Sequence, residues 1–94
     1  MTLFETLQIA AELADAEVAA AKAHCVTISR AWDAAEEAEN DCFSAEPTEE
    51  QQREMDYWFG IVEQQNARLA EANARYDGAV KVATHTWAAF KAVM

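Results

Sequence analysis

Metal binding and nucleophilic catalysis both need cysteine or histidine in suitable positions, and this chain of 94 residues has two of each. His24 and Cys25 are adjacent, so on a helix their side chains point about 100° apart and cannot comfortably share one ion. Cys42 stands among acids, which raise the pKa of a thiol and so oppose its activation. His85 is distant from all three in the fold derived below. We therefore expect no catalytic, metal or cofactor site and no enzymatic activity.

Carboxylates are the abundant ionisable groups, and they are concentrated in residues 33–56. This segment holds ten of the seventeen acids and a single cation, Arg53, so it carries −9 of the net charge of −10. Acids one helical turn apart lie about 5–6 Å from each other, within the range of spacings between neighbouring phosphates. Such an array suits a basic protein surface that binds DNA or RNA. It argues against direct binding to nucleic acid or to an anionic membrane, because both need positive charge.

The acids at the end of the first predicted helix are placed against the preferences of a helix. Asp33, Glu37 and Asp41 repeat at intervals of four residues, which sets like charges beside each other with no cation among them. Acids near a helix C-terminus also oppose its dipole, by about 0.3–1 kcal/mol each. Glu49, in contrast, falls in the first turn of the second helix and can pair with Arg53. Charge that works against local structure predicts a binding role; the alternative is that the acids serve solubility alone.

The predicted partner-binding residues are acids of this segment together with one neighbouring aromatic residue. They are Asp33, Glu36, Glu37, Asp41, Glu46, Glu49, Glu50, Glu54, Asp56 and Tyr57. The three tryptophans fall on or beside the predicted helix seam, so we expect them to pack in the core rather than to bind a partner.

The segment before residue 44 is predicted to form one helix. Thr2, with Glu5 three residues later, has the pattern of a capping box, so this helix should begin at about Leu3. Apolar residues then follow a heptad whose a and d positions stay apolar until Glu39. They are Phe4, Leu7, Ala11, Ala14, Val18, Ala21, Cys25, Ile28, Trp32 and Ala35.

A turn around Pro47 separates the two helices, because proline disfavours helical backbone at the residue before it. Thr48 and Gln51 offer a second capping box, which starts the second helix. Its apolar a positions are Met55, Val62, Leu69, Tyr76, Ala83 and Phe90. Six more residues are expected to widen this apolar stripe: Trp58, Phe59, Ala72, Val80, Trp87 and Val93.

These patterns predict an all-α protein, an antiparallel helical hairpin with coiled-coil-like packing. We expect a single helical domain over residues 1–94. Its first helix should span about 3–43, its acidic turn 44–48 and its second helix about 49–93.

The sequence does not decide whether the helices break at three places, which would divide the hairpin into three or four helices. They are residues 24–29, Gly60 and Gly78, because β-branched residues and glycine lower helix propensity. Folding back at the turn should bring Phe4 and Leu7 to face Trp87 and Phe90.

Apolar side chains that point away from the seam predict a homodimer. Ile9 and Leu13 lie off the heptad face of the first helix, and uncovered apolar surface usually marks a protein interface. The predicted dimerisation residues are Leu3, Ile9, Leu13, Val82 and Ala89. A four-helix bundle is one form of this dimer. In the alternative function, the chain is a self-assembling structural or scaffold protein and its acidic turn only keeps it soluble.

One short motif resembles a known family. Trp58-Phe59-Gly60 is a Trp-x-Gly motif, and a helical hairpin of this length that carries it resembles the WXG100 secretion substrates. In that family the motif lies in the turn between the helices, whereas here it lies well inside the second helix. The family's C-terminal Tyr-x-x-x-Asp/Glu is also missing, since the fourth residue after Tyr76 is Val80.

In size, charge and helical make-up the whole chain is similar to small acidic phage-encoded inhibitors, notably the anti-CRISPR proteins. That resemblance implies a non-catalytic inhibitor or regulator that occupies the basic surface of a nucleic-acid-binding complex, with DNA mimicry as one mode. It also implies the cytoplasm of a bacterial host as the location. The N-terminus lacks the cationic region of a signal peptide. The uncharged run over residues 23–29 is too short to span a bilayer. Both features favour a soluble cytoplasmic protein.

Overall fold

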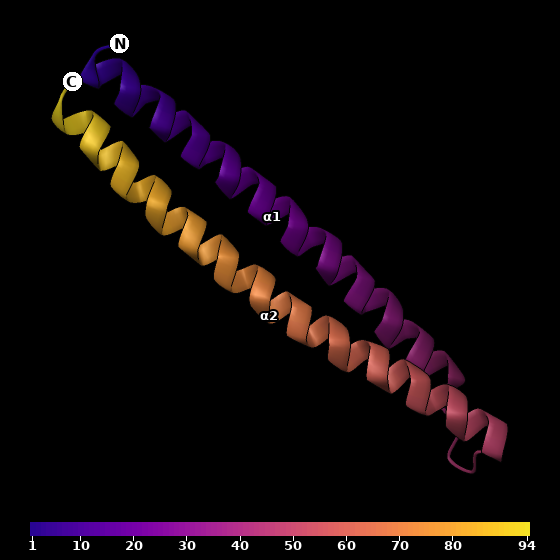
Figure 1. Ribbon diagram of the computed structural model, residues 1–94. Helices are drawn as coiled ribbons and strands as arrows, with labels where there is room; N and C mark the ends of the chain where they lie inside the picture. The colour runs from indigo at the N-terminus through magenta and orange to yellow at the C-terminus, as the bar shows by residue number, and fades with distance from the viewer. The chain divides into compact units, whose positions relative to one another are not determined.

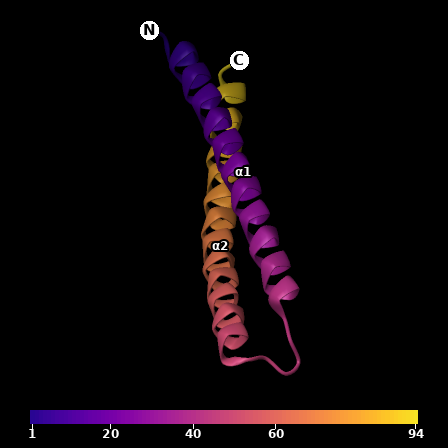
Figure 2. The same ribbon diagram turned by 90° about the vertical axis from the view of Figure 1, so that its right-hand side faces the viewer.

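The computed structural model describes residues 1–94 and consists of two long α-helices with no strand. Helix α1 spans Leu3–Cys42 and helix α2 spans Glu49–Ala92. They run antiparallel, and the short segment between them reverses the chain (Figures 1 and 2). The predicted all-α helical hairpin is therefore confirmed. Neither helix contains a stretch that is both long enough and apolar enough to cross a membrane.

Each helix begins with the capping threonine that the sequence predicts. The Glu5 backbone N–H donates to Thr2 Oγ1 over 3.2 Å at the start of α1. At the start of α2 the box is reciprocal: the Gln51 N–H donates to Thr48 Oγ1 over 3.2 Å, and the Thr48 N–H donates to Gln51 Oε1 over 2.9 Å. These bonds satisfy backbone donors that have no partner within the helix.

Both helices are continuous through the three places where the sequence left a break open. Residues 24–29 remain helical although they include β-branched side chains, and Gly60 and Gly78 are helical without a positive φ. A glycine costs only about 1 kcal/mol within a helix, which burial of the seam on both sides offsets. Ile28, at a d position within the β-branched stretch, is itself buried.

The contacts between the helices divide the hairpin into two compact units. One, which we call the terminal unit, comprises Met1–Cys25 and Ala72–Met94. The other, which we call the turn unit, comprises Val26–Glu71. The ten acids of residues 33–56 all belong to the turn unit, and both ends of the chain belong to the terminal unit (Figure 1).

The core of the terminal unit is mostly alanine, closed by one aromatic cluster. Its buried residues are Ala11, Ala21, Ala72, Ala79, Ala83 and Phe90. The ring of Phe90 lies 5.0 Å from that of Phe4 and 5.5 Å from that of Trp87, measured between centroids. Phe4 thus meets the Trp87 and Phe90 cluster that the sequence predicts it to face.

Two polar contacts join the helices on either side of this alanine seam. The indole N–H of Trp87 donates to Asp15 over 2.9 Å, and Arg75 donates to Glu17 over 2.8 Å. These pairs occupy the e and g positions that flank the a and d residues, where antiparallel helices exchange polar contacts. They fix the alignment of the two helices within the terminal unit.

The core of the turn unit contains larger side chains that are only partly covered. Ile28 and Ala35 are buried, while Trp32 and Trp58 are half-buried. The Nε1 atom of Trp32 is buried without a hydrogen-bond partner. All three tryptophans of the chain thus lie at the seam, as the sequence predicts.

Three residues that were expected to widen the apolar stripe of α2 are exposed, so that prediction is wrong. Phe59 and Val80 occupy e positions, at the side of the helix, and Val93 lies beyond the last helical residue. The heptad phase set by Met55 instead turns Gln65 and Thr86 partly inward. The position of a residue on the helix therefore decides whether it is buried, even when the residue is apolar. Because some d positions hold polar residues, the core contains less apolar surface.

Candidate protein-binding site

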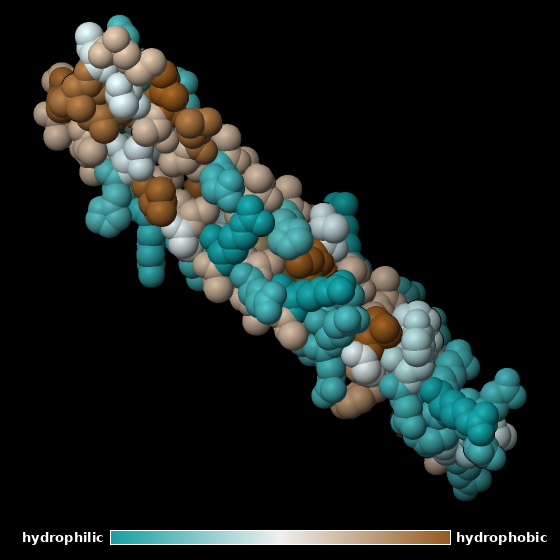
Figure 3. Space-filling view, viewed as in Figure 1, coloured by the Kyte–Doolittle hydropathy of each residue, from teal (hydrophilic) through white to brown (hydrophobic).

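The acids of residues 33–56 are mostly exposed on the turn unit. Eight of the ten are exposed, and only Glu36 and Glu39 are half-buried. The whole turn unit has twelve acids and three arginines, whereas the terminal unit has five acids and four lysine or arginine residues. In Figure 3 hydrophobic colour is densest at the end with the chain termini and hydrophilic colour at the end with the turn, and the two colours mix in between. The charge asymmetry predicted from the sequence is therefore a property of the surface.

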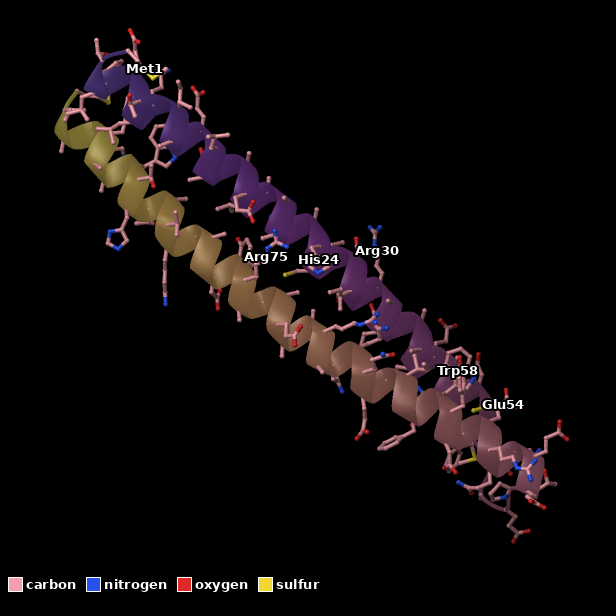
Figure 4. All side chains as sticks on the ribbon, in the orientation of Figure 1. Met1, His24, Arg30, Glu54, Trp58 and Arg75 are labelled. Carbon is pink, nitrogen blue, oxygen red and sulfur yellow. The ribbon has the colours of Figure 1, made fainter.

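At the end of α1 nothing neutralises the acids. The last turn contains no basic residue, and Arg30, the nearest cation along the helix, points away from α2 (Figure 4). The side chains of Asp33, Glu37 and Asp41 are exposed and separated by single helical turns. Like charge at this spacing and a helix C-terminus both disfavour the arrangement. It persists because these carboxylates keep their contact with water.

At the start of α2 the acids are partly compensated. Glu49 and Glu50 lie in the first turn, where the helix dipole favours them. Glu49 also accepts a hydrogen bond from Arg53 over 2.7 Å. Both side chains of that ion pair are well exposed, so it contributes at most a few tenths of a kcal/mol. The pairing occupies the one cation of the segment, which leaves Glu46, Glu54 and the α1 acids uncompensated.

Three aromatic side chains stand exposed beside these acids. Tyr57 is 60% exposed and packs edge-on against Trp58, with ring centroids 5.1 Å apart. Phe43 is 69% exposed and Phe59 is 52% exposed. Sequence reasoning selected Tyr57 alone. Phe59 could have been recognised from its heptad phase, whereas Phe43 follows the last residue of α1 and only the path of the turn exposes it.

An open groove lies where α1, the turn and α2 meet within the turn unit. It is lined by Ala38, Asp41, Cys42, Phe43, Ser44, Gln51, Glu54 and Trp58, with a volume of about 480 Å³. Glu54 and Trp58 face it from consecutive turns of α2 (Figure 4). The groove therefore places two carboxylates beside two aromatic rings, Phe43 and Trp58. This combination can receive a cationic side chain by charge and by contact with a ring face.

The pKa of the Cys42 thiol is affected by the charge of this groove. Partial burial and the carboxylate of Glu54 raise the pKa of Cys42 above its ordinary value, and Glu39 and Asp41 add to the effect. The thiol also donates a hydrogen bond to the Glu39 carbonyl oxygen over 3.2 Å, which holds the side chain at the groove. The sequence indicated the contribution of the neighbouring acids to this pKa, whereas burial, the largest cause, arises from the tertiary structure. The pKa of Cys42 therefore depends on the negative charge of the groove.

We predict that Glu54→Gln lowers the pKa of Cys42 and speeds its alkylation severalfold at a fixed, mildly alkaline pH. Removing the carboxylate charge favours the thiolate, which is the reactive form. The measurement is the pH dependence of iodoacetamide alkylation in a Cys25→Ala background. Glu63→Gln, an exposed change in the same unit, should leave the profile unchanged. An identical profile for both variants would show that Glu54 does not act on the groove.

The residues considered for metal or nucleophilic chemistry stay apart. Both cysteines are free thiols, with Cys25 half-buried at the seam. The structure brings together no group of three His, Cys, Asp or Glu side chains that could hold a metal ion. A second open groove, in the terminal unit, contains Asp15 as its one carboxylate. That carboxylate already accepts the Trp87 indole N–H.

The predicted dimerisation residues all lie on the terminal unit and are all exposed. They are Leu3, Ile9, Leu13, Val82 and Ala89. Apolar surface therefore gathers on the unit that is nearly neutral, and negative charge gathers on the other. The two classes of predicted site do not overlap.

No protein family matches this sequence, and neither does any curated protein or any solved structure. Function must therefore be inferred from the two surfaces themselves.

Proposed function

We propose that this protein is a non-catalytic inhibitor or regulator that binds a basic protein surface through its turn unit. The partner we propose is a nucleic-acid-binding complex, as for an anti-CRISPR protein or another phage product that blocks host defence. It would act in the cytoplasm of a bacterial host. The binding residues are the exposed acids of residues 33–56, with Tyr57, Phe43 and Phe59 beside them.

The groove of the turn unit is the observation that carries this proposal. Asp41 and Glu54 supply charge for an arginine or lysine of the partner, and Phe43 and Trp58 supply ring surface for its stem or guanidinium. A surface that served only solubility would need the carboxylates but not the exposed rings. Exposed aromatic side chains next to charge are instead typical of the residues that dominate protein interfaces.

The spacing of the acids favours a partner site built for nucleic acid. Asp33, Glu37 and Asp41 project from successive turns of one helix, about 5–6 Å apart. A row of fixed negative charges at this spacing resembles a phosphate backbone to a lysine- or arginine-rich groove. Binding of this kind forms quickly and weakens steeply with salt, because opposite charges attract over a distance set by screening.

Affinity capture with a salt gradient and a competitor tests this function. The immobilised wild-type chain should retain a basic nucleic-acid-binding protein from a bacterial lysate and release it at moderate salt. Added duplex DNA should displace the same protein, since both compete for one surface. Retention that is insensitive to both salt and DNA would contradict the proposal, as would recovery of no protein other than the chain itself.

Self-assembly is the second candidate function, and the exposed apolar residues of the terminal unit favour it. As a structural or scaffold protein, the chain would act through Ile9 and Leu13 and would tolerate the loss of its acids. Capture experiments separate the two functions, because charge reversal in the turn unit should harm only the inhibitor.

A further inference from the structure

Helix α1 carries a second stripe of uncharged residues on the side opposite its contact with α2. Its members recur at alternating intervals of three and four residues, which is heptad spacing. They are Thr6, Ile9, Leu13, Ala16, Ala20 and Ala23. All six are exposed and all lie in the terminal unit. No acid or base falls on the stripe between Thr6 and Ala23, although acids flank it at Glu5 and Glu12.

The exposure of this stripe contrasts with the inner seam of the same helix. Ala11 on the inner seam is 0% exposed, whereas Leu13 is 66% exposed and Ile9 is 44% exposed. Ile9 and Leu13 thus face outward, although the inner seam of the same segment holds the half-buried Leu7 and Val18 beside its buried alanines. A solvated face would normally carry charge on a helix of this kind. The sequence has instead given α1 the pattern of a helix with two packed faces.

The chain leaves more surface uncovered than a folded monomer of its mass usually does. It exposes 6724 Å², against about 5400 Å² expected for its mass. The difference, about 1300 Å², exceeds the roughly 800 Å² that each partner buries in a standard protein interface. No large side chain is fully buried, and six of the eight buried residues are alanine. A second packed face on α1 would supply the burial that the hairpin lacks.

Charge identifies the occupant as a second copy of this chain. The terminal unit, with five acids and four cations, is close to neutral and can approach its own copy without net repulsion. The turn unit, with twelve acids against three arginines, repels its own copy. Parallel association of two α1 helices would set their acidic C-terminal turns side by side. Antiparallel association separates those turns and is therefore favoured.

We infer that two copies associate through this stripe, with their α1 helices antiparallel about a twofold axis at Ala16. In that alignment Ile9 lies level with Ala23 of the second copy, and Leu13 lies level with its Ala19 and packs on Ala20, the neighbouring residue of the stripe. Each large side chain meets a small one, so the two helices can approach closely and interdigitate. An isologous contact of this form closes on itself and yields a dimer rather than a filament.

The flanking charges agree with the antiparallel alignment. Glu12 falls beside Ala19 of the second copy, and Glu5 falls close to its Val26, so neither acid meets an acid. Glu17 lies level with Asp15 of the second copy, and both carboxylates already have partners: Glu17 pairs with Arg75 over 2.8 Å, and Asp15 accepts the Trp87 indole N–H over 2.9 Å. This dimer seam is independent of the acidic site proposed above and needs no partner protein.

Two lysine substitutions at neighbouring exposed alanines test the seam by sedimentation equilibrium. Wild type should be dimeric at high micromolar concentration and partly dissociated at low micromolar concentration. Ala20→Lys should weaken self-association at least tenfold, because it buries a charge against Leu13 of the second copy. Ala19→Lys lies one residue away at the edge of the stripe, where Glu12 of the second copy can accept its charge, so it should leave the dimer intact. Circular dichroism should show the same helix content in all three.

Disulfide trapping tests the alignment itself, in a background where both native cysteines are alanine. Ala16→Cys should form a cross-linked dimer on mild oxidation, because residues on the twofold axis come within the roughly 7 Å that a disulfide requires. Ala19→Cys should not. A monomeric wild type would overturn the inference, as would equal effects of the two lysine substitutions. Dissociation by Val82→Lys but not by Ala20→Lys would also overturn it, because the contact would then lie on another face.

Discussion

Replacing Glu36, Glu37 and Asp41 by lysine is expected to abolish capture of a basic partner and to raise the melting temperature of the hairpin. The loss of binding follows from reversing charge at the end of α1 and at the groove, which Asp41 and Glu54 both line. Removing a charge that pairs across an interface typically costs 2–5 kcal/mol, and reversal adds repulsion. We therefore expect an affinity loss well above tenfold.

The gain in stability follows from the helix that these acids oppose. The last turns of α1 have no basic residue, and each lysine there would interact favourably with the helix dipole, by about 0.3–1 kcal/mol at low ionic strength. Glu37→Lys also converts the like-charge pair with Asp33 into an attractive one. A total of about 1–2 kcal/mol would raise the melting temperature by several degrees in a chain of this length.

A second triple variant, Glu12→Lys with Glu63→Lys and Asp77→Lys, is the matched control. It changes the net charge by the same amount at exposed positions outside residues 33–56. Partner capture, measured by surface plasmon resonance once the partner is identified, should survive in this control. Equal losses in the two variants would mean that binding depends on overall charge alone. Retained binding in the first variant would show that the acids serve only solubility.

Phe90→Ala is expected to destabilise the protein by about 3 kcal/mol, the largest effect of any single core substitution. Phe90 is the one aromatic residue in the buried core, and it holds both Phe4 and Trp87 by ring contacts. The alanines around it contribute little apolar area. Truncation therefore removes most of the contact at this end of the seam and leaves a cavity.

Urea denaturation followed by far-UV circular dichroism measures this loss as a lower midpoint. Phe90→Leu, which keeps most of the volume, should cost less than about 1.5 kcal/mol. Val82→Ala, an exposed change in the same unit, should stay within about 0.5 kcal/mol of wild type. A midpoint for Phe90→Ala equal to that of wild type would mean that alanine packing alone holds the terminal unit.

The fold of this protein follows from local signals that can be recognised in its sequence. Thr2 and Thr48 mark the helix starts, Pro47 marks the reversal, and a heptad that stays apolar as far as Ala35 marks the buried face of α1. Each of these signals acts over a few residues, so no distant contact is needed to interpret it. The same signals did not decide whether the helix breaks at Gly60 and Gly78. Each glycine costs about 1 kcal/mol in a helix, and packing elsewhere along the seam determines whether that cost is offset.

The candidate site could be predicted only in part. Its acids are visible as a run of like charge, and that charge proved to be exposed. Its aromatic members depend on geometry: Phe59 is exposed because of its heptad phase, and Phe43 because the chain leaves the helix at Cys42. The groove that joins Asp41 to Glu54 brings together residues from two helices, and a linear pattern does not show which residues face each other there.

By itself the sequence determined which parts of the chain are helical, where the chain reverses and where its negative charge lies. These depend on propensity, caps and composition, which act locally. The tertiary structure alone decided which carboxylates and rings share the groove, and that Arg75 pairs with Glu17 across the seam. It also decided that the inner seam is closed mainly by alanine. Such features depend on the rotation and alignment of one helix against the other, which the packing of both helices fixes together.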